Sequence, residues 1–244
     1  MRNNASSLAR GLSLLDAFGM GDPELTLTEI AERAGMPKST AHRLVGDLIA
    51  WGAIQRTANG LSLGMRLFEL GHLVPSPRAL REIALPYMED VHTTTRRTVN
   101  LAVLDGLQIV YVEKLTSPEV PVPHSRSGGR LPLHCTGLGK AILAHSPPEL
   151  LDQVIDAGLR RLTPKTIQDP KALRAELALV RQQGVAYDVE ESSLGLHCVA
   201  APLIDRNGVI RAALSVTGLQ SRSSARALSP AVLTAARSIS RQLH

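Results

Sequence analysis

The 244-residue sequence has few aromatic residues, only two cysteines and no long apolar run. Aromatic residues make up 2% of the chain, so a core must be built mainly from Leu, Val, Ile and Ala. Two cysteines, Cys135 and Cys198, are too few for a disulfide framework and indicate a reducing compartment. No segment approaches the ~18 apolar residues of a transmembrane helix. Because Arg10 and Asp16 interrupt the apolar N-terminal stretch, it does not fit a signal peptide. We therefore expect a soluble cytoplasmic protein without a membrane partner.

The charge of the chain is consistent with nucleic-acid binding, but only in one region. The net charge is +5 and the isoelectric point is about 9.6. Residues 1–75 nevertheless hold seven basic and seven acidic side chains, whereas residues 33–66 hold five basic and one acidic. This local excess, and not the global charge, is what would favour binding to a polyanion.

The first 64 residues show the pattern of a winged helix-turn-helix. Ser6 or Ser7 can cap a first helix, and Thr26 and Glu29 have the spacing of a capping box at the start of a second. Gly35 provides the turn to a third helix that begins at Pro37. Asn59-Gly60 is a strong hairpin signal between the strand-like runs 54–57 and 61–63. Two short helices joined by a tight turn and followed by a hairpin predict a winged helix-turn-helix.

This pattern favours DNA binding through the exposed face of the third helix. Its N-terminal side chains would meet bases and phosphates in the major groove, while basic residues of the wing and the first helix would contact the DNA backbone. The alternatives are a solvated helix face or a protein-interaction module. The candidate DNA-binding residues are Arg10, Lys38, Ser39, Thr40, His42, Arg43 and Arg56.

The rest of the chain predicts a linker helix over 65–76 and an α+β domain over 77–244, after a winged-helix domain over 1–64. The segment Pro75 to Pro77 is expected to break the linker helix. Behind it, helical segments alternate with β-rich runs, which predicts an antiparallel sheet flanked by helices. A final helix is expected from Pro230 to about Leu243.

The stretch "LPLHCTGLGKAIL" at 131–143 raises the question of an enzyme site. It is not a phosphate-binding loop, because the glycine required six residues before Lys140 is replaced by His134. Two His-Cys pairs, at 134–135 and 197–198, leave open a zinc site, and Asp188 leaves open a thiol catalytic site. A metal- or thiol-dependent enzyme or redox sensor using Cys135 and Cys198 is therefore the alternative function.

Seven segments in order resemble the IclR family of bacterial transcriptional regulators over essentially the whole chain. They read "SLARGLSLLDAF", "LTLTEIAERAGMPKSTAHRLVGDL", "GLSLGMRLFELG", "LPLHCTGLGKAILA", "RLTPKTI", "YDVEESSLGLHCVAAPLID" and "AALSVTG". The resemblance implies a winged helix-turn-helix, a linker helix and a C-terminal GAF-like effector-binding domain. It also implies a regulator without enzymatic activity or cofactor, which binds double-stranded DNA as a homodimer or as a tetramer formed from two dimers.

The same resemblance implies a small-molecule effector site in the C-terminal domain. Carried over by motif, the effector-binding residues are Gly137, Leu138, Asp188, Cys198, Ser215 and Thr217. Main-chain N–H groups at a helix start suit a carboxylate, and two hydroxyls two residues apart on a strand point the same way. The resulting hypothesis is that an effector, acting through the helix at 65–74, favours one spacing of the two DNA-binding domains.

Overall fold

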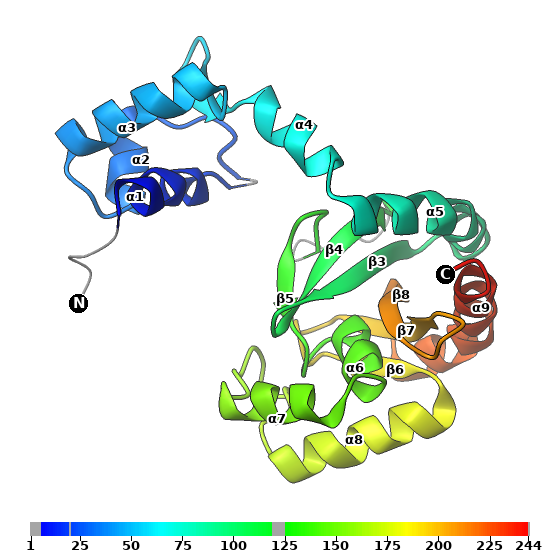
Figure 1. Cartoon of the computed structure of the whole chain (residues 1–244). Coiled ribbons are helices and arrows are strands. Elements are labelled where there is room, and N and C mark those ends of the chain that lie inside the picture. The colour runs from blue at the N-terminus through cyan, green and yellow to red at the C-terminus, as the bar shows by residue number, and fades with distance from the viewer. Residues whose placement is uncertain (1–5, 20, 119–124, 244) are drawn as a thin grey trace. The chain divides into compact units, whose positions relative to one another are not determined.

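The computed structural model describes residues 6–19, 21–118 and 125–243, and the chain divides into two units (Figure 1). The first unit is Met1–Pro75 and the second is Ser76–His244. Each unit has its own hydrophobic core. Among the described residues, none of the helices combines the length and the apolar character needed to cross a bilayer.

The first unit is a helical domain with a two-stranded hairpin, as the sequence predicts. Its elements are α1 (Ser7–Ser13), the 3-10 helix η1 (Leu15–Ala17), α2 (Leu27–Arg33), α3 (Lys38–Trp51), β1 (Ile54–Arg56), β2 (Leu61–Leu63) and α4 (Met65–His72). Ser6 caps α1 by accepting a hydrogen bond from the N–H of Ala9. The capping box of Thr26 and Glu29 is confirmed at the start of α2. Pro37 precedes α3 as its N-cap, so that helix begins one residue later than expected.

The hairpin and the two helices of the helix-turn-helix share one core. Its fully buried members include Leu14, Ile30, Ala41 and Ile54. Gly64 comes directly after the hairpin and packs against Gly52, the C-cap of α3. An added Cβ on Gly64 would lie 2.1 Å from the carbonyl oxygen of Gly52. Only glycine fits this position, which fixes where the wing ends and α4 begins.

The second unit is built on a six-stranded antiparallel sheet with strand order β5-β4-β3-β8-β7-β6. Its elements are α5 (Pro75–Thr95), β3 (Thr98–Asp105), β4 (Gln108–Leu115), β5 (Arg130–Pro132), α6 (Gly137–Ala144), α7 (Pro148–Asp156), α8 (Pro170–Gln183), β6 (Ala186–Val189), β7 (His197–Ile204), β8 (Ile210–Leu219) and α9 (Arg222–Ser240).

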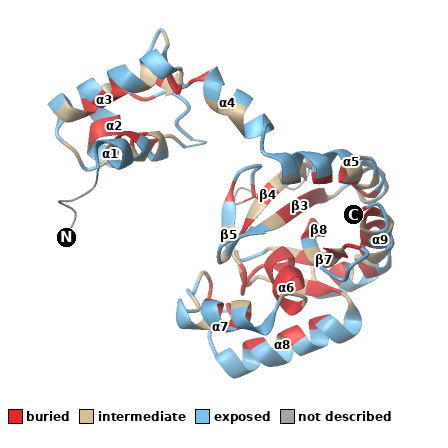
Figure 2. Cartoon of the chain, viewed as in Figure 1, coloured by how far each residue is buried: buried red, intermediate tan, exposed pale blue. Residues whose placement is uncertain are grey.

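Helices cover both faces of this sheet, and the alternation of side chains along β7 and β8 separates two cores (Figures 1 and 2). Val199 and Val216 point toward α5 and α9, where the core is aliphatic. Ala200 and Ala213 face α6, which lies directly on the sheet with α7 and α8 packed outside it. On that second face, small alanines leave room for α6, and polar residues follow toward one end of the strands.

Two local features differ from what the sequence indicates. The final helix begins at Arg222, not at Pro230, because Ser221 caps it and buried Ala225 and Val232 anchor it to the sheet. Packing thus outweighs the hydrogen bond that an internal proline removes. The expected break at Pro75 to Pro77 is present, because α4 ends at His72 and a separate helix, α5, begins at Pro75, in a first turn where proline is tolerated. The short strand β5, Arg130–Pro132, was not among the elements expected from the sequence.

Candidate functional site

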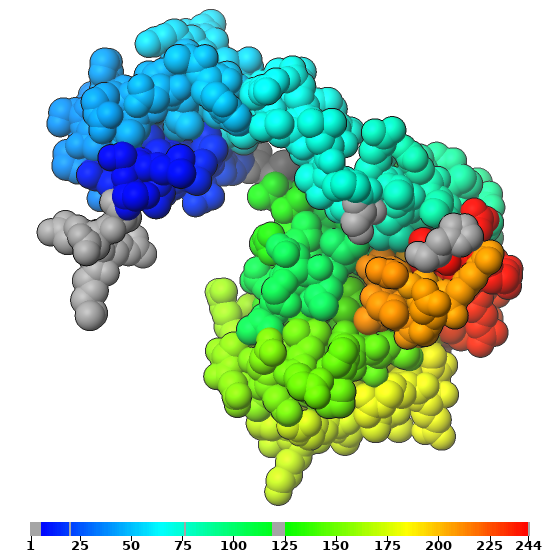
Figure 3. All heavy atoms as spheres, viewed as in Figure 1, coloured from blue at the N-terminus to red at the C-terminus, as the bar shows by residue number. Residues whose placement is uncertain are grey.

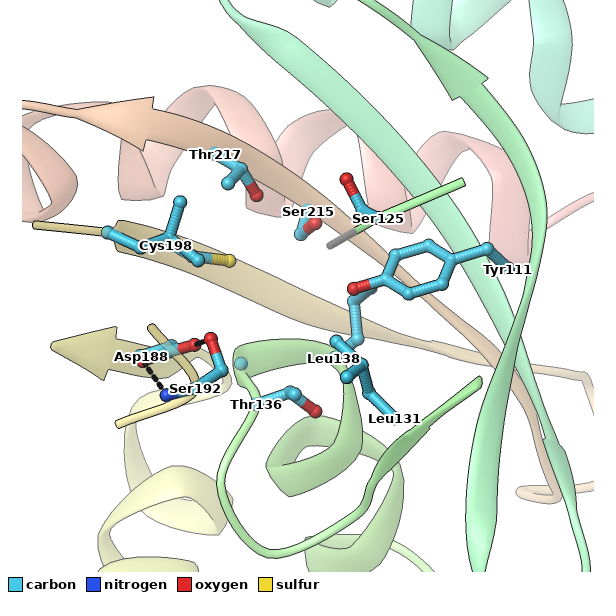
Figure 4. Close-up of a pocket in the computed structure, with 12 residues that line it drawn as sticks. Tyr111, Ser125, Leu131, Thr136, Leu138, Asp188, Ser192, Cys198, Ser215 and Thr217 are labelled. Atoms are coloured by element: carbon cyan, nitrogen blue, oxygen red, sulfur yellow. Dashed lines mark hydrogen bonds between the residues drawn. The ribbon is translucent and has the colours of Figure 1, made fainter. Parts of the chain in front are cut away.

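A small enclosed pocket lies between the N-terminus of α6 and the polar end of the sheet, with a cavity volume of about 20 Å³ (Figure 4). All six residues that the resemblance assigned to an effector line it. Six further residues complete the wall. These additional lining residues are Tyr111, Ser125, Leu131, Thr136, Ser192 and Leu196.

The N-terminus of α6 presents free main-chain donors to this pocket. Thr136 caps the helix by accepting a hydrogen bond of 3.0 Å from the N–H of Gly139. In the described part of the chain, no acceptor is bonded to the N–H groups of Gly137 and Leu138. An added Cβ on Gly139 would lie 2.3 Å from the carbonyl oxygen of Leu133. Gly139 therefore lets the helix pack on the loop that leads into it, while the two N–H groups before it remain available to a ligand.

The sheet contributes two hydroxyl groups to the pocket, and a residue on the neighbouring strand orients both of them. Ser215 and Thr217 both lie on β8, and Nδ2 of Asn100 on β3 donates to their hydroxyl oxygens at 3.3 and 3.2 Å. Because both oxygens accept from Asn100, their own hydrogens are free to donate to the pocket or to the neighbouring Cys198 thiol. Asn100 was missed in the sequence because a single asparagine in a β-rich run gives no local signal.

The carboxylate of Asp188 mainly holds the adjoining loop. Its Oδ1 accepts hydrogen bonds from the N–H groups of Glu191 at 2.8 Å and Ser192 at 3.3 Å, and the Ser192 hydroxyl donates to Oδ2 (Figure 4). Burial raises the pKa of Asp188, although these hydrogen bonds oppose the shift. Asp188 therefore fixes Ser192, a lining residue, in the pocket wall.

Two threonines hold the same loop from the outside. The hydroxyl of Thr163 donates to the carbonyl oxygen of Glu190 at 2.6 Å, and that of Thr166 donates to the carbonyl oxygen of Glu191 at 2.7 Å. Glu190 has a positive φ of 60°, which is uncommon for a residue with a side chain. The segment "RLTPKTI" thus forms a clamp on the loop that closes the pocket.

Lys140 is fully buried and lies in an ion-pair cluster beside the pocket. Its Nζ contacts the carboxylate of Glu191 in the pocket loop and, at 3.1 Å, that of Glu176 on α8. Burial alone would lower the pKa of Lys140, but the two carboxylates outweigh it and the pKa is raised. Burial also raises the pKa of Glu191 to about 7. The lysine of "GLGK" therefore joins α6, α8 and the loop, and none of the described residues that line the pocket is an arginine or a lysine.

Neither cysteine has the surroundings of a reactive or metal-binding thiol. Burial raises the pKa of both Cys135 and Cys198 to about 12. His134 is engaged through Nε2 with the carbonyl oxygen of Arg160 at 3.0 Å. No cluster of three or more metal ligands occurs among the residues that the structure describes. The geometry does not favour the alternative of a metal- or thiol-dependent protein.

The candidate DNA-binding residues lie in the first unit. Lys38, Ser39, His42 and Arg43 are exposed on α3, and Thr40 is half-buried. His42 and Arg56 border the same small hollow between α3 and the hairpin. Arg43 lies 3.8 Å from Asp47 on the same helix, an exposed pair of little energetic weight. Arg10 lies on α1, half-buried and apart from that hollow.

Comparison with known proteins assigns both units to one family. Residues 7–58 match the IclR helix-turn-helix domain, and residues 73–241 match the model described as bacterial transcriptional regulator IclR C-terminal. The chain belongs to the IclR family. IclR-family proteins are DNA-binding transcriptional regulators and not enzymes, so the two units of this chain are a DNA-binding domain and the family's C-terminal effector domain.

Several characterised regulators are similar to this IclR-family chain over most of its length. It is 36% identical over 219 residues to the HTH-type transcriptional regulator XynR of Escherichia coli, covering 88% of this chain and 87% of that protein. It is 33% identical over 221 residues to the transcriptional repressor IclR of Escherichia coli, covering 88% and 81%. The similarity therefore spans both units.

Solved structures of IclR regulators share the fold. An IclR homologue from Microbacterium hydrocarbonoxydans, crystallised with 4-hydroxybenzoate, has a TM-score of 0.88 and 33% identity, covering 96% of this chain and 98% of that one. The IclR protein of Thermotoga maritima has a TM-score of 0.80 and 31% identity, covering 97% and 98%. The order of a helix-turn-helix domain and an α+β effector domain is thus confirmed.

Proposed function

We propose that this regulator binds operator DNA in the cytoplasm as a homodimer or a dimer of dimers, and that a small carboxylic acid changes its operator affinity. The observation that carries the effector part is the set of free donors at the pocket. The N–H groups of Gly137 and Leu138 lack acceptors in the described chain, and the hydroxyls of Ser215 and Thr217 accept from Asn100, so they can donate to a ligand in place of the Cys198 thiol.

A carboxylate matches these donors better than a cation or an apolar molecule does. The N-terminal end of a helix carries partial positive charge and open N–H groups, which suit an anionic oxygen. Leu131, Leu138 and Leu196 supply the apolar part of the wall for the carbon skeleton. In support, the M. hydrocarbonoxydans homologue binds 4-hydroxybenzoate, which has a carboxylate on an apolar ring.

The small cavity volume supports a role for effector binding in conformational change. About 20 Å³ is little more than the roughly 10–15 Å³ that a single water needs. A ligand of several carbon atoms therefore enters only if part of the wall moves. The loop is held by polar contacts with Asp188, Thr163 and Thr166, together with the ion pair between Glu191 and Lys140, and no residue of its 190–196 segment belongs to the hydrophobic cores of the described chain. We assign the opening to this loop.

The pocket influences the operator only if the effector distinguishes two arrangements of the protein. A ligand shifts such an equilibrium by no more than the ratio of its affinities for the two states. We infer that the open pocket favours one spacing of the two DNA-binding domains across the dimer, through α4. The third helix α3 would then enter the major groove with Lys38, Ser39, Thr40, His42 and Arg43, while Arg56 and Arg10 contact the backbone.

The exposed apolar surface of the first unit supports dimer formation. The described residues of α4 include none that are buried, and Met65 and Phe68 are 64% and 61% exposed. On α1, Leu8 is 73% exposed. A short helix in water is stabilised mainly by burying an apolar face, and monomers rarely expose such clusters. We propose that a second copy of the chain covers α1 and α4.

Size-exclusion chromatography with light scattering tests the dimer. The wild-type chain should elute at twice or four times 26.2 kDa. Phe68→Glu should shift it toward the monomer, because the charge would lie in the covered face. Leu179→Glu, at an apolar residue of α8 that is 49% exposed, is the matched control and should leave the mass unchanged. A wild-type monomer at micromolar concentration would refute the dimer.

A thermal-shift screen of small aliphatic and aromatic carboxylic acids tests the effector site. An acid at about 100 times its Kd should stabilise the protein by about 2.7 kcal/mol. Asp188→Ala and Ser215→Ala should abolish the shift, the first by releasing the loop and the second by removing a donor. Ser223→Ala, an exposed serine on α9, is the control and should keep it. Intact shifts in both pocket variants would place the acid elsewhere.

A further inference from the structure

The whole positive surplus of the chain lies in its last forty residues. Residues 205–244 hold six arginines and one aspartate, whereas residues 1–204 hold 21 basic and 21 acidic side chains. The one aspartate, Asp205, is paired with Arg211. Three of the other arginines, Arg222, Arg226 and Arg237, are on α9, which contains no acidic residue, and Arg241 is its C-cap. The net charge of +5 is therefore concentrated on one helix and its immediate surroundings.

The three arginines of α9 and the arginine at its C-cap form a stripe. At 100° per residue, Arg222, Arg226, Arg237 and Arg241 fall within an arc of about 100°, and the first and last are about 28 Å apart along the axis. All four are exposed. Within the described part of the chain, none of them forms an ion pair. We call these four residues the arginine stripe.

The opposite side of α9 is fixed to the sheet, so the stripe is held at the surface. Ala225, Val232 and Ile239 are buried in the core shared with β7 and β8. The hydroxyls of Tyr187 and Ser229 are hydrogen-bonded at 2.9 Å. In the space-filling view, α9 at the red end of the colour scale forms part of the molecular surface (Figure 3). The stripe is therefore a rigid cationic surface and not part of a flexible tail.

We propose that the arginine stripe binds phosphate groups of double-stranded DNA, as a second contact surface that acts without reading sequence. The guanidinium group donates in a planar fork that matches phosphate oxygens. The DNA-binding unit has a local basic excess over residues 33–66 but no net charge over residues 1–75, so a second cationic surface would add to the general attraction that phosphate neutralisation gives. This interaction goes beyond the proposed function, because it requires neither an effector nor a particular operator sequence.

The composition of the stripe favours DNA over an acidic protein. Stable protein interfaces have a central anchor of large apolar or aromatic side chains. None of the exposed large apolar residues in the described chain lies on α9. Between the arginines stand small residues, including the exposed Ser223 and Thr234, whose hydroxyls also donate to phosphate. This face is therefore positively charged but has little apolar area to bury, which suits DNA phosphates better than a protein surface.

The test measures the salt dependence of binding of the full chain to a fluorescein-labelled 30-base-pair duplex of mixed sequence. Two stripe variants, R222Q/R226Q and R237Q/R241Q, each remove two charges. The control R160Q/K171Q removes two charges from exposed residues elsewhere in the same unit. For every phosphate that is no longer neutralised, the slope of log K against log salt should fall by about 0.9. Each stripe variant should therefore bind roughly 60-fold more weakly near 0.1 M salt, if the affinities converge near 1 M salt, and the control should match wild type.

Two comparisons make the result decisive. Stripe variants that bind the duplex as tightly as the control does would overturn the proposal. A loss of binding to an acidic protein would not rescue it. An equal weakening in the control would also overturn it, because net charge and not the stripe would then explain the effect. The variant R237K/R241K should retain the wild-type slope, since it keeps both charges. Circular dichroism checks folding, and the second stripe pair remains as a test if the first does not fold.

Discussion

The helices α3 and α6 both begin after a short loop, and we propose that each presents its N-terminal region to a partner, but their surroundings are opposite. In α3 the polar face is exposed, and its N-cap, Pro37, makes no side-chain hydrogen bond to the helix. In α6 all eight residues are buried, including Lys140, and Thr136 caps the helix. An exposed helix end suits a large polyanion that comes from outside, whereas an enclosed one suits a molecule small enough to be surrounded.

The largest difference should come from removing a charge in each helix. Lys140→Met would leave Glu176 and Glu191 without their buried cation, which should destabilise the second unit by about 3–5 kcal/mol. Arg43→Met on α3 should change stability by no more than about 0.5 kcal/mol, because its side chain is exposed. Urea unfolding checks both, with Trp51 fluorescence reporting the first unit and circular dichroism the whole chain. Equal losses in the free energy of unfolding for the two variants would show that Lys140 does not form the buried ion pairs with Glu176 and Glu191.

Glycine substitutions should separate the two helices next. Gly139→Ala should destabilise by about 1–3 kcal/mol, because the new Cβ would meet the carbonyl oxygen of Leu133. Gly46→Ala in α3 has open space around its Cβ and should stabilise that helix by about 0.5–1 kcal/mol. The melting temperatures of the two variants should therefore move in opposite directions. A Gly139→Ala protein as stable as wild type would contradict the close packing of α6 on the loop that leads into it.

A smaller effect is expected from Asn100, which acts on the pocket only through Ser215 and Thr217. Asn100→Leu removes the donor that orients both hydroxyls, and should weaken binding of a carboxylic acid by about 1 kcal/mol, or roughly fivefold. Isothermal titration of the acid found in the thermal-shift screen measures this. An unchanged Kd in a folded Asn100→Leu protein would remove the orienting role.

The smallest expected effect concerns the thiols. With pKa values raised to about 12, Cys135 and Cys198 should not react with an aromatic disulfide reagent at pH 8 in the folded protein, and both should react in urea. Since both pKa values exceed the unfolded value of 9.0, the associated stability is complete below pH 9 and is lost as pH rises toward 12. Rapid labelling of either native thiol would revive the redox alternative.

The two helices also differ in how well the sequence predicts them. The capping box, turn and hairpin around α3 are local patterns, and they were correct within a residue or two. The surroundings of α6 depend on Glu176 and Glu191, which are 36 and 51 residues from Lys140. Spacing along the chain cannot indicate such partners. The six predicted pocket residues were brought together only by the family resemblance. That resemblance did not indicate Tyr111, which lines the pocket, or Asn100, which orients two of its hydroxyls.

The most direct test of the central claim is fluorescence anisotropy of the full chain on a duplex from the promoter region beside its own gene. Binding should be sequence-preferring and salt-sensitive. A saturating acid from the thermal-shift screen should change the DNA affinity by about 5-fold or more, the lower end of usual allosteric coupling. The Ser215→Ala protein should bind the same duplex without responding to the acid. Wild-type protein that shows no sequence preference, or whose affinity is the same with and without saturating acid, would contradict the account.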